Sequence, residues 1–85
     1  MILVEKISLT VRVPALGGRY EFLVPAQMAV RDAQLLMVRI LHSEYGISEN
    51  AAGTILFDTC DGKALRQECS LEQQEITSGH ELMLL

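Results

Sequence analysis

The sequence VRDAQLLMVRILHSEY, residues 30–45, decides the fold. Placed on a helix, its apolar side chains form one broad stripe, which contains Val30, Ala33, Leu36, Met37, Ile40 and Leu41. Gly46 stands where a left-handed C-terminal cap is expected, and Pro25 lies shortly before the start. Burial of such side chains stabilises a fold by roughly 1 to 3 kcal/mol each, before conformational entropy is subtracted. We therefore expect this helix to be the main source of core.

The segment before the helix has the period of β-strands. Residues 7–13 alternate strictly between apolar and polar side chains, and residues 19–24 alternate in the same way. Between them stands Pro-Ala-Leu-Gly-Gly, a turn sequence whose glycines tolerate positive φ. Two alternating runs joined by a short Gly-rich loop predict an antiparallel hairpin.

Three further strands are predicted after the helix. Residues 54–57 and 63–65 flank an Asp-Gly turn signal, residues 70–76 have the spacing of one helical turn, and residues 81–85 form the last strand. This order, ββαββ when the short strand at 63–65 is left out, predicts an α+β domain over residues 1–85, with one main helix on a mixed four- to five-stranded sheet. Because the first and last strands are both rich in apolar residues, we expect them to pair in parallel at the centre. This is the β-grasp arrangement.

Composition and charge exclude several classes of function. Hydrophobic residues make up 49% of the chain and charged residues 21%, which is typical of a globular domain. A net charge of −4 argues against nucleic-acid binding, because nothing here neutralises a run of phosphates. No apolar run reaches membrane-spanning length, and the start lacks the pattern of a secretory leader. We therefore expect a cytoplasmic protein without direct membrane insertion.

The order of elements resembles ubiquitin over nearly the whole chain. The best-matched stretch is residues 54–85, with an Ile-Leu-Phe strand, a Gly-Lys turn, Ser70-Leu71 before Ile76, and a Leu-x-Leu strand. Within that fold, the ending of the chain looks like the YukD-type family, small ubiquitin-like accessories of bacterial type VII secretion. Glu75 and His80 depart from the family pattern, which often has Gly and Asp there. The resemblance implies a non-catalytic module that binds a larger component of the secretion machinery.

Two other functions share parts of this pattern. Small ubiquitin-like subunits of multicomponent monooxygenases have similar short motifs, so a subunit of such an enzyme complex is the alternative. A modifier or sulfur carrier is less expected, because those proteins end in Gly-Gly, whose missing Cβ atoms let the terminus enter an activating enzyme. This chain has no diglycine tail and stops at Met83-Leu84-Leu85. We therefore expect no conjugation unless the chain is truncated.

The sequence predicts neither an enzyme nor a metal site, and no cofactor. Cys60 and Cys69 stand nine positions apart without a second pair, which makes a poor zinc site, although a disulfide between them is conceivable. His42 and His80 have no nucleophile or carboxylate at a recognisable catalytic spacing. Without a secretory leader, reduced thiols are the better prediction.

A protein-docking face on the sheet is the first candidate site. The alternation predicts that Leu56, Met83 and Leu85 point outward on one face, with Leu16 of the first turn at its rim. The inward set would be Ile55, Phe57, Leu82 and Leu84. A contiguous apolar patch of this kind usually marks a partner site. The alternatives are a homodimer contact and scattered surface hydrophobic residues without a function.

The outer face of the helix is the second candidate site. Its residues are Arg31, Leu35, Val38, Arg39 and His42. An apolar pair with a basic rim, on an acidic protein, predicts docking of an acidic or helical partner. The alternative is that residues 48–53 bury the apolar pair.

Overall fold

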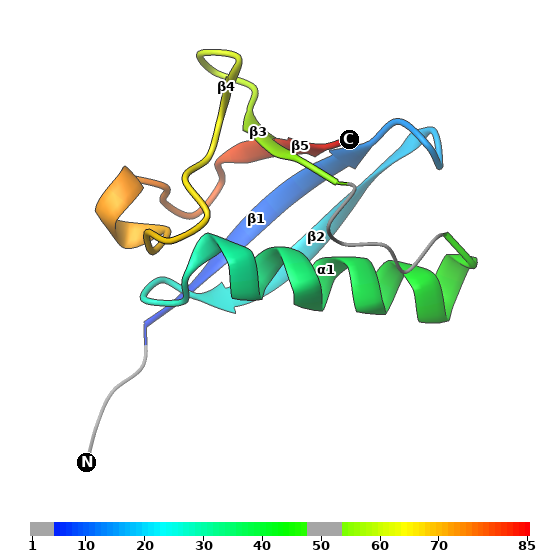
Figure 1. Ribbon diagram of the computed structural model, residues 1–85, viewed down its shortest axis with the longest axis horizontal. Coiled ribbons are helices and arrows are strands. Elements are labelled where there is room, and N and C mark those ends of the chain that lie inside the picture. Colours follow the sequence, from blue (N-terminus) through cyan, green and yellow to red (C-terminus); the bar gives the residue numbers. More distant parts are fainter. Residues whose placement is uncertain (1–4, 48–53) are drawn as a thin grey trace.

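The computed structural model describes residues 5–47 and 54–85 of the chain. One helix, α1 (Val30–Tyr45), lies against a five-stranded sheet whose strand order is β2-β1-β5-β3-β4 (Figure 1). The α+β class and the β-grasp order predicted from the sequence are confirmed.

The first two strands form the predicted antiparallel hairpin. Strand β1 spans Lys6–Val13 and β2 spans Gly18–Pro25, with Val13 opposite Gly18 across the turn. Gly17 has a φ of 70°, a left-handed conformation in which a Cβ atom would be strained. The inner side chains of β1 are buried at every second position, as the alternation predicts.

The C-terminal half completes the sheet. Strand β5 (Glu81–Leu84) pairs in parallel with β1 at the sheet centre, and β3 (Leu56–Asp58) pairs antiparallel with β5. Strand β4 (Lys63–Ala64) adds a short edge, and the 3₁₀ helix η2 (Glu72–Gln74) takes the place of the predicted single turn. The side chains on the inner face of the central strands are completely buried, as expected where parallel strands lie beneath a helix. The side chains there with less than 2% exposure are Leu9, Val11, Val13, Leu56 and Leu82.

Helix α1 is closed at each end by backbone groups. Its first N–H groups receive no side-chain cap; instead the Val30 N–H donates to the Cys69 carbonyl at 2.9 Å. At the other end Gly46 adopts a φ of 73°, and its N–H donates to the His42 carbonyl at 2.9 Å. This is the left-handed cap predicted from the sequence. The start of α1 is thus held by a segment nearly forty residues away.

The buried stripe of α1 differs from the predicted one. Leu36 and Ile40 are exposed, whereas Gln34 and Val38 are buried. The buried Gln34 is hydrogen-bonded: its side-chain amide donates to the Thr54 carbonyl at 2.9 Å and to the Thr54 hydroxyl at 2.6 Å. These bonds satisfy a polar group that would otherwise be costly to bury.

Strand β3 has the opposite phase from the prediction. Leu56 is 1% exposed and points into the core, whereas Ile55 is 48% exposed and Phe57 is half-buried. Opposite residues of an antiparallel pair share a face, and Leu56 lies opposite the buried Leu84. Phe57 lies opposite Met83, on the outer face. The prediction that Leu56 is a surface residue is therefore wrong.

Candidate docking face

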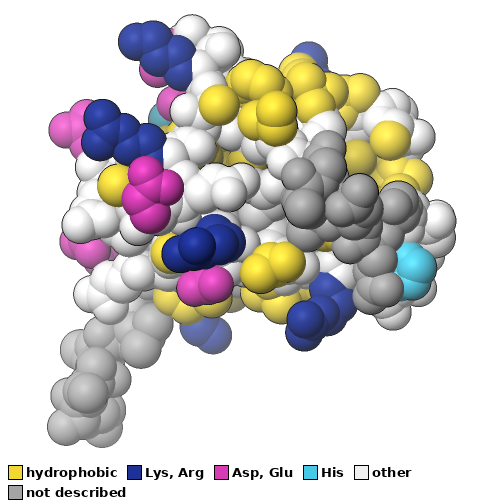
Figure 2. Space-filling model, viewed as in Figure 1, with side chains coloured by type: hydrophobic (Ala, Val, Ile, Leu, Met, Phe, Trp, Pro, Cys, Tyr) yellow, Lys and Arg dark blue, Asp and Glu magenta, His cyan; other side chains and the backbone are white. Residues whose placement is uncertain are grey.

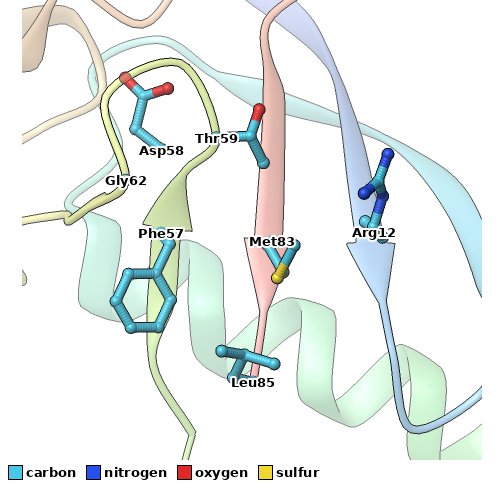
Figure 3. Close-up of a pocket in the computed structure, with 7 residues that line it drawn as sticks. All are labelled: Arg12, Phe57, Asp58, Thr59, Gly62, Met83 and Leu85. Carbon is cyan, nitrogen blue, oxygen red and sulfur yellow. The ribbon is translucent and has the colours of Figure 1, made fainter.

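The outer face of the sheet carries an open hollow of about 390 Å³ (Figure 3). Figure 3 views this face with α1 behind the sheet, and the side chains of Phe57, Met83 and Leu85 lie together on it. They come from β3, from β5 and from the residue that follows β5. The complete lining is Arg12, Phe57, Asp58, Thr59, Gly62, Met83 and Leu85. The surface that the hollow offers to a binding partner is thus mostly apolar.

The turn after β3 forms one wall of the hollow and is fixed by local hydrogen bonds. The Asp58 carboxylate accepts from the Cys60 N–H at 2.9 Å, and the Asp61 carboxylate accepts from the Lys63 N–H at 3.0 Å. The Thr59 hydroxyl donates to the Glu81 carbonyl at 2.9 Å. Side chains that bond backbone groups two residues on are typical of tight turns. This wall is therefore tied to β5 and not only to β3.

Asp58 also pairs with His80. The Nε2 atom of His80 lies 2.9 Å from Oδ1 of Asp58, and both side chains are largely buried. Burial raises the pKa of Asp58, but the hydrogen bond from the Cys60 amide and the hydrogen bond and charge of His80 outweigh it, so the pKa lies below 3.8. Sequence analysis found no carboxylate for His80; the partner stands 22 residues away and meets it only because β3 and β5 are neighbours.

Of the four residues predicted for this face, two line the hollow and two do not. Met83 and Leu85 line the hollow, as the alternation of the last strand indicates. Leu56 is buried beneath it, and Leu16 packs partly against the core. Sequence analysis missed Phe57, because the run Ile-Leu-Phe is apolar at every position and carries no alternation signal. It also missed Arg12, although the strict alternation of β1 already placed Arg12 on the polar face.

The second predicted surface, on α1, is only partly present. Arg31, Leu35, Arg39 and His42 are exposed, and Figure 2 shows basic and apolar side chains close together over α1. Val38, however, is 1% exposed, so it is a core residue and its assignment to this surface is wrong. The alternative prediction, burial against residues 48–53, lies outside the described residues. Partner binding by the helix stays a prediction.

The two cysteines belong to no metal-binding group of side chains in the described residues. Cys60 is exposed, Cys69 is half-buried, and both are free thiols. Within residues 5–47 and 54–85, no three side chains of His, Cys, Asp or Glu are grouped closely enough to hold a metal ion. In the same part of the chain, no helix combines the length and apolarity needed to cross a membrane.

Comparison with known proteins shows similarity in structure. No protein-family model and no curated protein matches the sequence. Among solved structures, the N-terminal ubiquitin-like domain of the 4931431F19Rik protein superposes with a TM-score of 0.79 and 25% identity, over 98% of this chain and 76% of that one. The EccD5 ubiquitin-like domain from Mycobacterium xenopi has a TM-score of 0.69 and 22% identity, over 95% of this chain and 93% of that one.

A third similar structure is the ubiquitin-like domain of Plasmodium falciparum Dsk2, with a TM-score of 0.68 and 18% identity, over 94% of this chain and 96% of that one. These proteins share one architecture with the sheet and helix described above. The chain therefore has the ubiquitin-like β-grasp fold.

Proposed function

We propose that this chain is a non-catalytic ubiquitin-like module that binds a protein partner through the outer sheet face. The observation that carries the proposal is the hollow floored by Phe57 and Met83 and bounded by Leu85, which is 54% exposed. Apolar side chains gathered in one open hollow typically mark an interaction site. Ubiquitin-like domains generally act as protein-interaction modules, which agrees with this use of the face.

The cellular setting that we propose is bacterial type VII secretion. EccD5 is a component of a type VII secretion system, and its ubiquitin-like domain has the same fold over nearly the full length of both chains. The YukD-like ending of the sequence supports the same setting. The partner would then be a larger component of the secretion machinery, bound on the cytoplasmic side. The shared fold supports this role by analogy.

The test is capture of partners from native lysate by the wild-type protein and by surface variants. Met83→Asp and Phe57→Asp place a charge in the hollow, and each should reduce capture at least about tenfold, because burial of either side chain is worth roughly 1.5–3 kcal/mol. Leu23→Asp is the matched control, since Leu23 is 64% exposed on the same sheet face but lies on the far edge strand β2. Leu56→Asp is unsuitable, because Leu56 is buried.

Mass spectrometry of the captured proteins separates the functions. A secretion-system component that is lost with Met83→Asp but kept with Leu23→Asp supports the proposal. An iron-containing hydroxylase would favour the oxygenase-subunit alternative instead. Equal capture by all the variants, with folding verified by circular dichroism, would show that the outer hollow is not the docking face.

A further inference from the structure

One cross-strand row on the outer face combines positive charge with apolar surface. The strand registers place Arg19 of β2 opposite Arg12 of β1, Arg12 beside Met83 of β5, Met83 opposite Phe57 of β3, and Phe57 opposite Ala64 of β4. Residues opposite one another in a sheet point to the same side. The row therefore changes from two cations to apolar side chains as it crosses the sheet, and Arg12 itself lines the hollow.

The two arginines share one carboxylate. Nη2 of Arg12 lies 3.4 Å from Oε1 of Glu81, and Nε of Arg19 lies 3.7 Å from Oε2. Both distances exceed those of charge-assisted hydrogen bonds, and exposed ion pairs contribute only about 0–1 kcal/mol. Like charges directly opposite on neighbouring strands also repel each other. The two arginines can therefore bind a second carboxylate, and Glu81 competes with that carboxylate for them.

Charged residues are distributed unevenly around this row. Glu21 and Glu81 occupy the next row on one side of the arginines, and Leu85 occupies the next row on the other side. Asp58 also lines the hollow, but it lies opposite the buried Leu82, and its carboxylate is paired with His80. The cations of the row stand at its β1–β2 end, so an incoming acid is attracted to that end.

We propose that the segment docked on this face is acidic and apolar, with an apolar side chain over Met83 and Phe57 and a carboxylate over Arg12 and Arg19. This inference rests on the function proposed above and names the partner's chemistry. Neighbouring strands lie about 4.8 Å apart, so the two groups must stand about 10 Å apart. That separation corresponds to about seven residues of a helix or about three residues of an extended chain.

The first experiment determines which kinds of side chain are enriched in peptides that bind this face. Random 16-residue peptides displayed on phage are selected on the immobilised wild-type protein, and only those that fail to bind Met83→Asp are kept. We expect Asp and Glu to outnumber Lys and Arg in the retained peptides. This outcome is informative because the protein's own net charge of −4 favours basic peptides over acidic ones.

The second experiment measures the affinity of the most enriched peptide for three variants. Arg12→Gln and Arg19→Gln should each weaken binding about 2- to 5-fold, and Glu81→Gln should tighten it by a similar factor, because it releases the arginines. Glu81→Gln leaves in place the backbone carbonyl that accepts from Thr59. A merely structural role for this cluster would make all three variants bind more weakly.

The outcomes distinguish the two proposals. Peptides that need Met83 but show no acidic excess, or do not respond to Arg12→Gln, overturn the inference and leave the docking face intact. Peptides that bind Met83→Asp as well as wild type, or an absence of binders, overturn both. A homodimer in light scattering that dissociates with Met83→Asp would place a second copy on this face and also overturn the inference.

Discussion

Adjacent residues on β3 provide a direct test of the fold. Leu56 points into the core opposite Leu84, whereas Phe57 lies on the outer face opposite Met83. Leu56→Ala removes a side chain that is 1% exposed, and such buried substitutions cost about 2–5 kcal/mol. Phe57→Ala removes a half-exposed side chain from a strand, where the whole propensity scale spans about 1 kcal/mol. The smaller side chain should therefore be the more important one for stability.

Urea unfolding followed by circular dichroism measures the difference. With a slope of about 2 kcal/mol per molar urea, a loss of about 3 kcal/mol for Leu56→Ala lowers the midpoint by about 1.5 M. The shift for Phe57→Ala should stay below about 0.5 M. A larger shift for Phe57→Ala than for Leu56→Ala would refute the phase assigned to β3, and with it the hollow on the outer face.

Three further predictions follow from single sites. Glu75 has a φ of 60°, so Glu75→Gly should relieve the strain of the left-handed backbone and raise the free energy of unfolding by up to about 1 kcal/mol. This corresponds to an increase of about 4–8 °C in Tm, and no increase would show that the site is unstrained. Because the pKa of Asp58 is lower in the folded state, its ionised carboxylate stabilises the fold above the unfolded-state pKa, and this stabilisation is lost as the pH falls through the folded-state pKa. The free energy of unfolding should therefore fall less steeply between about pH 5 and pH 2 for Asp58→Asn than for the wild type. Val38→Asp should unfold the domain, because it buries an unpaired charge, whereas Leu35→Asp should leave the circular dichroism spectrum unchanged; equal tolerance would contradict the helix orientation.

Some of the outer hollow could be predicted from sequence and some could not. The last strand was assigned correctly because His-Glu-Leu-Met-Leu alternates, so Leu82 and Leu84 had to share one face and Met83 the other. The run Ile55-Leu56-Phe57, which leads into β3, does not alternate between apolar and polar residues, so either face of the strand could have been the buried one. The choice was made by pairing with β5, which puts Leu56 opposite Leu84. A register of this kind depends on contacts nearly thirty residues apart.

The same limit applies to the helix and to the charged cluster. Apolar periodicity placed Val30, Met37 and Leu41 in the core, but it left the rotation of the stripe free by a fraction of a turn. The rotation in the structure is the one that buries Gln34, whose side-chain amide donates to Thr54, twenty residues away. Nothing local indicates that Arg12 meets Glu81, because the two come together only when β1 and β5 pair in parallel.

The sequence alone determined the kind and order of the main elements, since helix and strand periods and turn residues are properties of neighbouring positions. It also determined the α+β class, because one amphipathic helix and several alternating strands have few ways to bury their apolar faces together. Only the tertiary structure decided which side of β3 faces the solvent, how α1 is rotated, and which charges border the hollow. Those features depend on strand register and on long-range hydrogen bonds, which form only when the whole chain is packed.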